Sequence, residues 1–240
     1  MYGWRATIGF MLPASCTVFE QDFIKITASL PGVIGCASRM FLRSTDADGL
    51  RDMNNHIDKC SEELASVGPD LVIYMCTSGS FLEGNAWEMA IRERIKTITK
   101  APIVTSTSQS VLEALKAQDV RKVAMWTPYD KLVTEQEVKW LNDNSVEVVD
   151  YEYGDIFHNL DRGAQTPERT YYRLKKLDHS KANGIFQSCG NIRGIEILGQ
   201  LEEDLQKPVI NSSQATTWFA LRNLGIRTKI SGFGSLFEKV

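Results

Sequence analysis

The chain reads Leu71-Val72-Ile73-Tyr74-Met75-Cys76-Thr77-Ser78-Gly79 where an apolar run meets a cysteine, two hydroxyl residues and a glycine. The apolar run is short and contains β-branched residues, which is typical of a buried strand. A second stretch, Gly184-Ile185-Phe186-Gln187-Ser188-Cys189-Gly190-Asn191, has the same form. Both apolar runs end in a cysteine that a small residue follows. We therefore predict two equivalent strands whose terminal cysteines, Cys76 and Cys189, face one pocket.

Strand and helix patterns alternate through the first half of the chain. Short apolar runs predict strands at 6–12, 34–42 and 102–104, in addition to the one at 71–75. Apolar residues at helical spacing predict helices that run from Phe19 to the Pro31-Gly32 pair and at 46–67, 86–98 and 108–117. Alternation of this kind predicts a parallel sheet that helices cover on both faces.

The second half repeats this order. Strands are expected at 123–126, 147–151 and 184–188, and helices at 134–142 and 166–177. The run Pro102-Ile103-Val104-Thr105-Ser106 returns as Pro208-Val209-Ile210-Asn211-Ser212. The period of roughly 110 residues is far longer than that of a solenoid repeat. We therefore predict an α/β fold with two similar lobes, 1–108 and 109–213, related by a pseudo-two-fold axis, with 214–240 packing back on the first lobe.

The cleft between these lobes is the expected site. Ligands of open α/β sheets bind outside the carboxyl ends of the strands, where Cys76 and Cys189 lie. Backbone N–H groups and the positive end of a helix dipole at such a position are expected to lower the pKa of a thiol. The alternative is that both cysteines are small buried packing residues. Their duplicated positions and small or hydroxyl neighbours favour the functional interpretation.

Neutral hydrogen-bond donors follow each cysteine. The hydroxyls of Thr77 and Ser78 and the amide of Gly190 can form a cradle for a carboxylate, although turn formation and helix capping also explain these residues. Tyr129 follows Thr-Pro after the first strand of the second lobe and could add a phenol donor, or be a surface turn residue. Cys16 occupies the equivalent turn of the first lobe, where it borders the pocket or only packs.

Composition excludes several classes of function. The formal net charge of −3 gives no basic excess for neutralising phosphates, which argues against nucleic acid as a partner. The five cysteines show no CxxC spacing and the three histidines stand apart, so neither a disulfide framework nor a metal site is indicated. No run approaches the ~20 apolar residues of a membrane span. We expect a cytoplasmic protein without a metal site.

Several short motifs together resemble a known superfamily. They are Cys76-Thr77-Ser78, Ser188-Cys189-Gly190, Pro13-Ala14-Ser15, Thr127-Pro128-Tyr129 and His158-Asn159-Leu160. With the duplication and the chain length, they resemble the aspartate/glutamate racemase superfamily over nearly the whole chain. The likeness is closest to its branch of maleate cis-trans isomerases and arylmalonate decarboxylases. This resemblance implies a cofactor-independent enzyme whose cysteines act at a carbon beside a carboxylate.

The resemblance also implies roles for individual residues. Cys76 would be the nucleophile and Cys189 the general acid and base. The implied carboxylate binders are Thr77, Ser78, Tyr129, Asn159 and Gly190. Decarboxylases of this branch carry only the second cysteine, so the presence of Cys76 argues against that activity. Similar isomerases have an asparagine where this chain has Cys16, so a carboxylate-binding amide is replaced by a weak thiol donor.

Three functions follow as hypotheses. The first is cis-trans isomerisation of a small unsaturated dicarboxylate, of the maleate to fumarate type. The second is racemisation or epimerisation of an acidic amino acid or a hydantoin, in which the two thiols remove and return a proton on opposite faces. The third is a non-catalytic protein that binds carboxylates. All three imply a small carboxylate as partner, and the sequence leaves open whether the chain forms a homo-oligomer.

Overall fold

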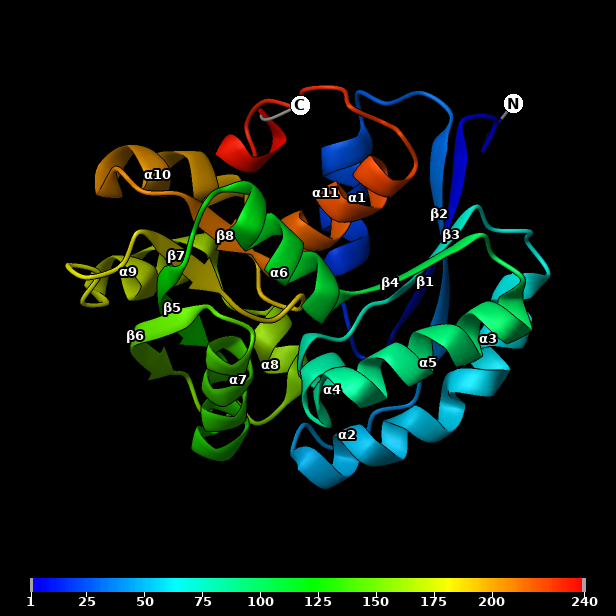
Figure 1. Cartoon of the computed structure of the whole chain (residues 1–240), viewed down its shortest axis with the longest axis horizontal. Helices are drawn as coiled ribbons and strands as arrows, with labels where there is room; N and C mark the ends of the chain where they lie inside the picture. Colours follow the sequence, from blue (N-terminus) through cyan, green and yellow to red (C-terminus); the bar gives the residue numbers. More distant parts are fainter. Residues whose placement is uncertain (1, 239–240) are drawn as a thin grey trace.

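The computed structural model of the chain describes residues 2–238 and has two four-stranded parallel sheets flanked by helices (Figure 1). Their strand orders are β2-β1-β3-β4 and β6-β5-β7-β8. The first four strands and the last four thus follow the same order, second-first-third-fourth. The predicted fold class, two similar α/β lobes that share one topology, is confirmed. The lobe boundaries at residues 108 and 213 stay a prediction.

The first sheet and its helices come from the first half of the chain. The strands are β1 (Ala6–Pro13), β2 (Val33–Met40), β3 (Leu71–Tyr74) and β4 (Ile103–Ser106). The helices are α1 (Phe19–Thr27), α2 (Ala47–Met53), α3 (Ile57–Ala65), α4 (Thr77–Phe81), α5 (Gly84–Thr99) and α6 (Thr107–Ala117).

The second sheet repeats the arrangement. Its strands are β5 (Lys122–Thr127), β6 (Glu147–Tyr153), β7 (Gly184–Gln187) and β8 (Val209–Asn211). The helices are α7 (Lys131–Asp143), α8 (Asn159–Gly163), α9 (Pro167–Lys176), α10 (Leu198–Leu205) and α11 (Ser212–Asn223). Single-turn 3₁₀ helices occur at Asn54–His56, Ile195–Ile197 and Ser235–Phe237.

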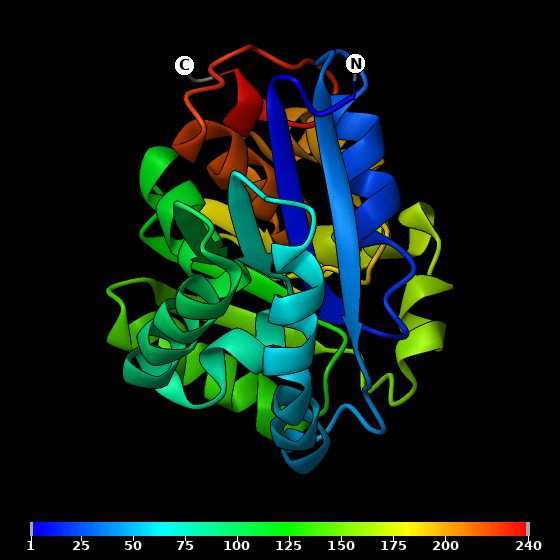
Figure 2. The same ribbon diagram turned by 90° about the vertical axis from the view of Figure 1, so that its right-hand side faces the viewer.

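The side chains of β3 divide between two apolar cores because successive residues of a strand point to opposite faces. Leu71 and Ile73 belong to the larger core, which continues into the second lobe. Val72 and Tyr74 belong to a smaller core with residues of α2, α3 and α5. Figure 2 views the molecule from the side of the first lobe and shows α3 in front of its sheet. A strand covered on both faces explains why β3 is apolar throughout.

Helices α6 and α11 lie between the two sheets (Figure 1). They pack against each other, and each contacts strands of both lobes, β4 and β8 among them. Each also follows directly on a strand whose last residue caps it. Ser106 accepts the N–H of Gln109, and Asn211 forms a capping box with Gln214. The strand ends are thereby fixed where the lobes meet.

Some helices differ from the sequence-based expectation. The single helix expected at 46–67 is two helices separated by the 3₁₀ turn Asn54–His56. Asparagine has a weak helix propensity, and the Oδ1 of Asn54 accepts the Tyr74 hydroxyl at 2.5 Å, which holds the break in place. Helices α4, α8 and α10 were not expected: α4 and α8 are too short to show an apolar face, and the spacing of Leu198, Leu201 and Leu205 in α10 was overlooked. Within residues 2–238, no helix is both long and apolar enough to cross a membrane.

Candidate active site

A cavity of about 380 Å³, including open solvent at its mouth, lies where the carboxyl ends of the strands of both lobes meet. Residues that follow β1, β3, β5 and β7 line it, as the topology of the two sheets requires. All eight residues named from the sequence are among the lining residues: Cys16, Cys76, Thr77, Ser78, Tyr129, Asn159, Cys189 and Gly190. The structure thus brings the whole predicted set together in one place.

Cys76 is the residue at which β3 becomes α4. Its backbone is extended, and its Sγ accepts the N–H of Gly79 at 3.4 Å, so the thiol caps the short helix. The hydroxyl of Ser78 lies 3.9 Å from the same sulfur. Burial raises the pKa of Cys76 to about 11, although the Gly79 N–H and the Ser78 hydroxyl act in the opposite direction. The resting side chain is therefore a thiol.

Cys189 follows β7 with a different backbone conformation. Its φ is 80°, a left-handed value that is rare for residues other than glycine, and its Sγ accepts the N–H of Asn191 at 3.4 Å. Burial raises the pKa of Cys189, while the charge of Arg162, the Asn191 N–H and the Tyr129 hydroxyl lower it. Each sulfur therefore has one backbone donor, but only Cys189 has a strained backbone.

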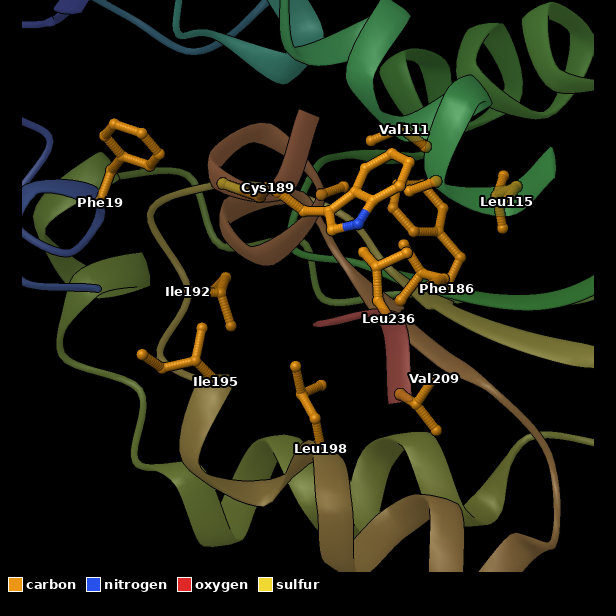
Figure 3. Close-up of a cluster of buried hydrophobic side chains, with 14 of the residues drawn as sticks. Phe19, Val111, Leu115, Phe186, Cys189, Ile192, Ile195, Leu198, Val209 and Leu236 are labelled. Carbon is orange, nitrogen blue, oxygen red and sulfur yellow. The ribbon is translucent and has the colours of Figure 1, made fainter. Parts of the chain in front are cut away.

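The expectation of lowered thiol pKa values is wrong. The backbone N–H groups are present and act in the expected direction, but loss of solvent outweighs them. Cys16, the third thiol, is also buried, and its pKa is raised to about 12. Figure 3 shows Cys189 within a cluster of buried apolar side chains that also contains Phe186 and Ile192. These apolar surroundings keep the thiols protonated.

A buried carboxyl lies behind the phenol of Tyr129. The Ser188 hydroxyl is 2.7 Å from Oε1 of Glu137 and 3.5 Å from the Tyr129 hydroxyl. Burial raises the pKa of Glu137 to about 8, against the effect of the Ser188 hydrogen bond. Glu137 is therefore mostly protonated at neutral pH, and it supplies little negative charge to the cavity. Sequence reasoning missed it because it lies on α7 among ordinary surface charges.

Two asparagines of the second lobe hold the turn that carries Cys16. Asn159 Nδ2 donates to the Ser15 hydroxyl at 2.9 Å. Asn191 Oδ1 accepts the N–H groups of Thr17 at 2.8 Å and Val18 at 3.2 Å, and its Nδ2 donates to the Asn159 carbonyl at 2.7 Å. The start of α1 has no side-chain cap of its own, so Asn191 provides one from the other lobe. The sequence indicated only the backbone amide of this residue.

Arg162 is a cavity residue that sequence reasoning missed. It lies on α8 with 3% of its surface exposed, and its guanidinium stacks over the Tyr129 ring at 5.0 Å from the centroid. Nε donates to the Ile156 carbonyl at 2.8 Å and Nη2 to the Thr45 hydroxyl at 2.9 Å. An arginine in a polar stretch is typical of a surface position, so no local signal distinguishes it.

The lining of the cavity suits a small acid. Its neutral donors include the Thr77 hydroxyl, which is buried and has no hydrogen-bond partner within residues 2–238. A buried polar group without a partner is unusual, and a bound ligand would satisfy it. No three His, Cys, Asp or Glu side chains in the described part of the chain come together as a metal site. Three thiols, a guanidinium and several neutral groups that can donate hydrogen bonds to a carboxylate are the chemistry that this cavity offers.

Comparisons with known sequences identify relatives of the chain. The sequence profile of the arylmalonate decarboxylase family matches residues 26–237. The chain is 25% identical over 243 residues to maleate isomerase of Geobacillus stearothermophilus, with 96% of each protein covered. It is 28% identical over 237 residues to arylmalonate decarboxylase of Bordetella bronchiseptica, with 97% of each covered.

Solved structures share the fold. A cysteine mutant of maleate cis-trans isomerase from Nocardia farcinica, with a covalently bound succinylcysteine intermediate, superposes with a TM-score of 0.94 at 21% identity, covering 98% of this chain and 99% of that one. A cysteine mutant of maleate isomerase from Pseudomonas putida S16, solved with maleate, gives a TM-score of 0.91 at 24% identity and covers 98% of both chains. The two-sheet architecture is thus that of known enzymes.

Proposed function

The chain belongs to the arylmalonate decarboxylase family, and from this membership and the site geometry we propose that it is a cis-trans isomerase of a small unsaturated dicarboxylate, of the maleate to fumarate type. The observation that carries the proposal is that Cys76 and Cys189 line one cavity together with groups that can donate hydrogen bonds to a carboxylate. The family contains both isomerases and a decarboxylase. A thiol at both strand ends provides a nucleophile and a separate proton donor, which isomerisation by thiol addition requires.

In the proposed first step, Cys76 acts as the nucleophile. Its proton passes to water at the open mouth of the cavity, an S–C bond forms to one alkene carbon, and the π electron pair moves to the neighbouring carbon. The thiol of Cys189 then donates a proton to that carbon, which leaves a thioether and a C–C single bond. The covalent succinylcysteine intermediate solved in the Nocardia farcinica enzyme is an adduct of this kind.

The second half of the reaction reverses these events after rotation about the single bond. The Cys189 thiolate removes a proton from the same carbon, the double bond re-forms, and the S–C bond to Cys76 breaks. The product is the trans isomer, Cys189 is again a thiol, and the Cys76 thiolate takes a proton back from water, so both residues return to their starting protonation states. No external oxidant, reductant or hydride is needed, because every electron pair stays within the substrate and the two sulfurs.

The proposed role of the backbone donors is to stabilise the thiolates as they form. With a pKa of about 11, roughly one Cys76 side chain in a thousand is ionised at pH 8. The N–H of Gly79 at 3.4 Å is in place before the charge develops, so no group has to reorganise. Thr77, Ser78, Tyr129, Asn159, Gly190 and Cys16 are proposed to bind the carboxylates.

Proton NMR in deuterated water tests the proposal directly. The protein is incubated separately with maleate, aspartate, glutamate and an aryl malonate. We expect the fumarate signal to grow from maleate only. Exchange of the α-proton of aspartate or glutamate would instead establish a racemase, and loss of carbon dioxide from the aryl malonate a decarboxylase. Binding of these acids without any product would favour the non-catalytic alternative.

Single cysteine variants then test the assignment. Cys76→Ser and Cys189→Ser should each lower turnover at least about a hundredfold, the scale of lost nucleophilic or acid–base catalysis. Cys36→Ser is the matched control, because Cys36 is a free cysteine on β2 that does not line the cavity. It should turn over substrate like the wild type. Wild-type turnover in Cys76→Ser would overturn the mechanism.

A further inference from the structure

Arg162 is a buried cation without a counter-ion. With 3% of its surface exposed, its recorded partners are a backbone carbonyl, the hydroxyl of Thr45 and the ring of Tyr129. None of these groups carries a negative charge at neutral pH, and no Asp or Glu within residues 2–238 forms an ion pair with Arg162. Burying a charge is unfavourable unless an opposite charge compensates it. The anion that compensates this one must come from the contents of the cavity.

The neighbouring acidic groups do not supply that charge. Glu137, the buried acid near Tyr129, is hydrogen-bonded to Ser188, and burial keeps it mostly protonated at neutral pH. Cys76 and Cys189 are thiols at rest for the same physical reason. The protein groups around the cavity therefore leave it positively charged on the side of Arg162.

The guanidinium is also held in a fixed orientation. Nε and Nη2 donate to Ile156 and Thr45, and the Thr45 hydroxyl in turn donates to the Phe157 carbonyl at 2.7 Å. Nη1 has no hydrogen-bond partner among the described residues, and the side chain lines the cavity. A planar guanidinium with an unused edge is well suited to a carboxylate.

We propose that Arg162 binds one carboxylate of the substrate and makes the site selective for dianions. The second carboxylate binds to neutral donors, of which the unpartnered Thr77 hydroxyl is one. This inference rests on the proposed function, which places the substrate in this cavity. It attributes the selectivity for dicarboxylates to Arg162. Arg162 is then a specificity-determining residue that contacts the substrate.

Binding measurements test the inference without requiring turnover. Titration calorimetry compares maleate with monomethyl maleate, which has the same carbon skeleton and one charge fewer. The Cys76→Ser chain serves as parent, so that turnover during the titration is small. We expect the parent to bind maleate about ten- to a hundredfold more tightly than the monoester, the range of a charge-assisted hydrogen bond. In Arg162→Gln the two affinities should become equal to within about threefold, and Arg162→Lys should restore part of the preference.

Arg173→Gln is the matched control. Arg173 also lies partly buried over an aromatic ring, 4.8 Å from the centroid of Trp126, but it does not line the cavity. Its replacement should leave both affinities unchanged. If Arg162→Gln fails to fold, the comparison of maleate with its monoester in the parent still decides, because equal affinities there would overturn the inference.

The outcomes separate this inference from the proposed isomerase activity. An Arg162-dependent preference for maleate in a protein that produces no fumarate supports the inference and overturns the isomerase. Turnover of maleate with an unchanged KM in Arg162→Gln supports the isomerase activity and overturns the role proposed for Arg162. A rise in KM with little change in kcat is the kinetic result expected when both hold.

Discussion

Ser188, the residue before Cys189, donates a 2.7 Å hydrogen bond to the fully buried carboxyl of Glu137. The other oxygen of Glu137 has no hydrogen-bond partner within the described residues. An ionised carboxylate in this position would be strongly destabilising, which is why burial raises the pKa of Glu137 to about 8. The same hydroxyl of Ser188 lies 3.5 Å from the hydroxyl of Tyr129, which lines the cavity. Ser188 thus connects Glu137 to a cavity residue.

This carboxyl makes stability depend on pH. The pKa of Glu137 is higher in the folded than in the unfolded state, so its proton stabilises the fold below about pH 4.5 and that stabilisation is lost as pH rises toward 8. The free energy of unfolding should fall by up to about 1.4 kcal/mol per pH unit from this group. Glu137→Gln should reduce the dependence of the free energy of unfolding on pH between pH 5 and 8. Urea unfolding at a series of pH values measures this dependence.

Asp22 gives a second contribution of the same sign, because burial raises its pKa to about 8 as well. The free energy of unfolding of Glu137→Gln will therefore still fall somewhat as the pH rises. Glu135→Gln is the control, since Glu135 lies exposed on the same helix and pairs with Lys131. Parallel pH profiles for wild type and Glu137→Gln would show that the buried carboxyl does not titrate in this window.

The thiols should react slowly with alkylating reagents at neutral pH. Because only the thiolate is nucleophilic, the rate at which iodoacetamide modifies Cys76 should rise about tenfold per pH unit between pH 7 and 9. Peptide mass spectrometry follows each cysteine separately. The half-buried Cys36 should be modified before Cys76 at pH 7.5, since it is more accessible. Rapid labelling of Cys76 that does not depend on pH would mean that its pKa is low.

Gly190 leaves no space for a side chain. A Cβ at this position would lie 2.0 Å from the Cε of Met75, whose sulfur accepts the Thr107 hydroxyl at 3.0 Å. Gly190→Ala should therefore displace Met75, destabilise the fold by about 1–3 kcal/mol and lower kcat/KM. Thermal unfolding and initial rates measure the two effects.

A double variant and a control identify the cause. Adding Met75→Ala to Gly190→Ala removes the clash, so the two substitutions together should cost less than the sum of their separate effects. Gly199→Ala on α10 has open space around the new methyl group and should be neutral or slightly stabilising. Simple additivity would exclude a steric conflict between Gly190 and Met75.

Asn191 connects the two lobes at the start of α1. Asn191→Ala leaves the N–H groups of Thr17 and Val18 without their acceptor and should destabilise the protein by about 1–3 kcal/mol. Hydrogen exchange should increase at these two amides. Asn191→Asp keeps the acceptor and should protect them. Asn223→Ala, which removes only an exposed helical bond to the Phe219 carbonyl, should change neither stability nor exchange at Thr17.

The sequence predicted the parts of the fold that depend on local pattern. The strand at 71–75 is observed at Leu71–Tyr74, and the expected echo of 102–106 in 208–212 corresponds to β4 and β8. Both are short apolar runs bounded by turn residues, which a single sequence shows clearly. The helix expected at 46–67 is broken because Tyr74, a distant residue, binds Asn54, and local spacing carries no sign of that bond.

For the site, the sequence predicted which residues lie at strand ends, but it did not predict how deeply they are buried or what packs around them. Cys76 and Cys189 were identified because each ends an apolar run, yet the direction of their pKa shifts depends on what packs over them. Arg162 went unnoticed because its burial depends on Thr45, 117 positions earlier in the chain. Desolvation and long-range contacts are properties of the folded chain, so they appear only when the lobes are assembled.

The left-handed backbone at Cys189 has a consequence for symmetry. The two sheets repeat each other, but Cys76 leaves its strand with a φ of −147° and Cys189 with a φ of 80°. Because φ sets the direction in which Cβ leaves the preceding chain, the two thiols leave equivalent strands in different ways. A ligand between the two cysteines therefore meets two unequal ends of the site. Two copies of one architecture thus form a site whose two ends differ, because one cysteine has a left-handed φ and the other an extended one.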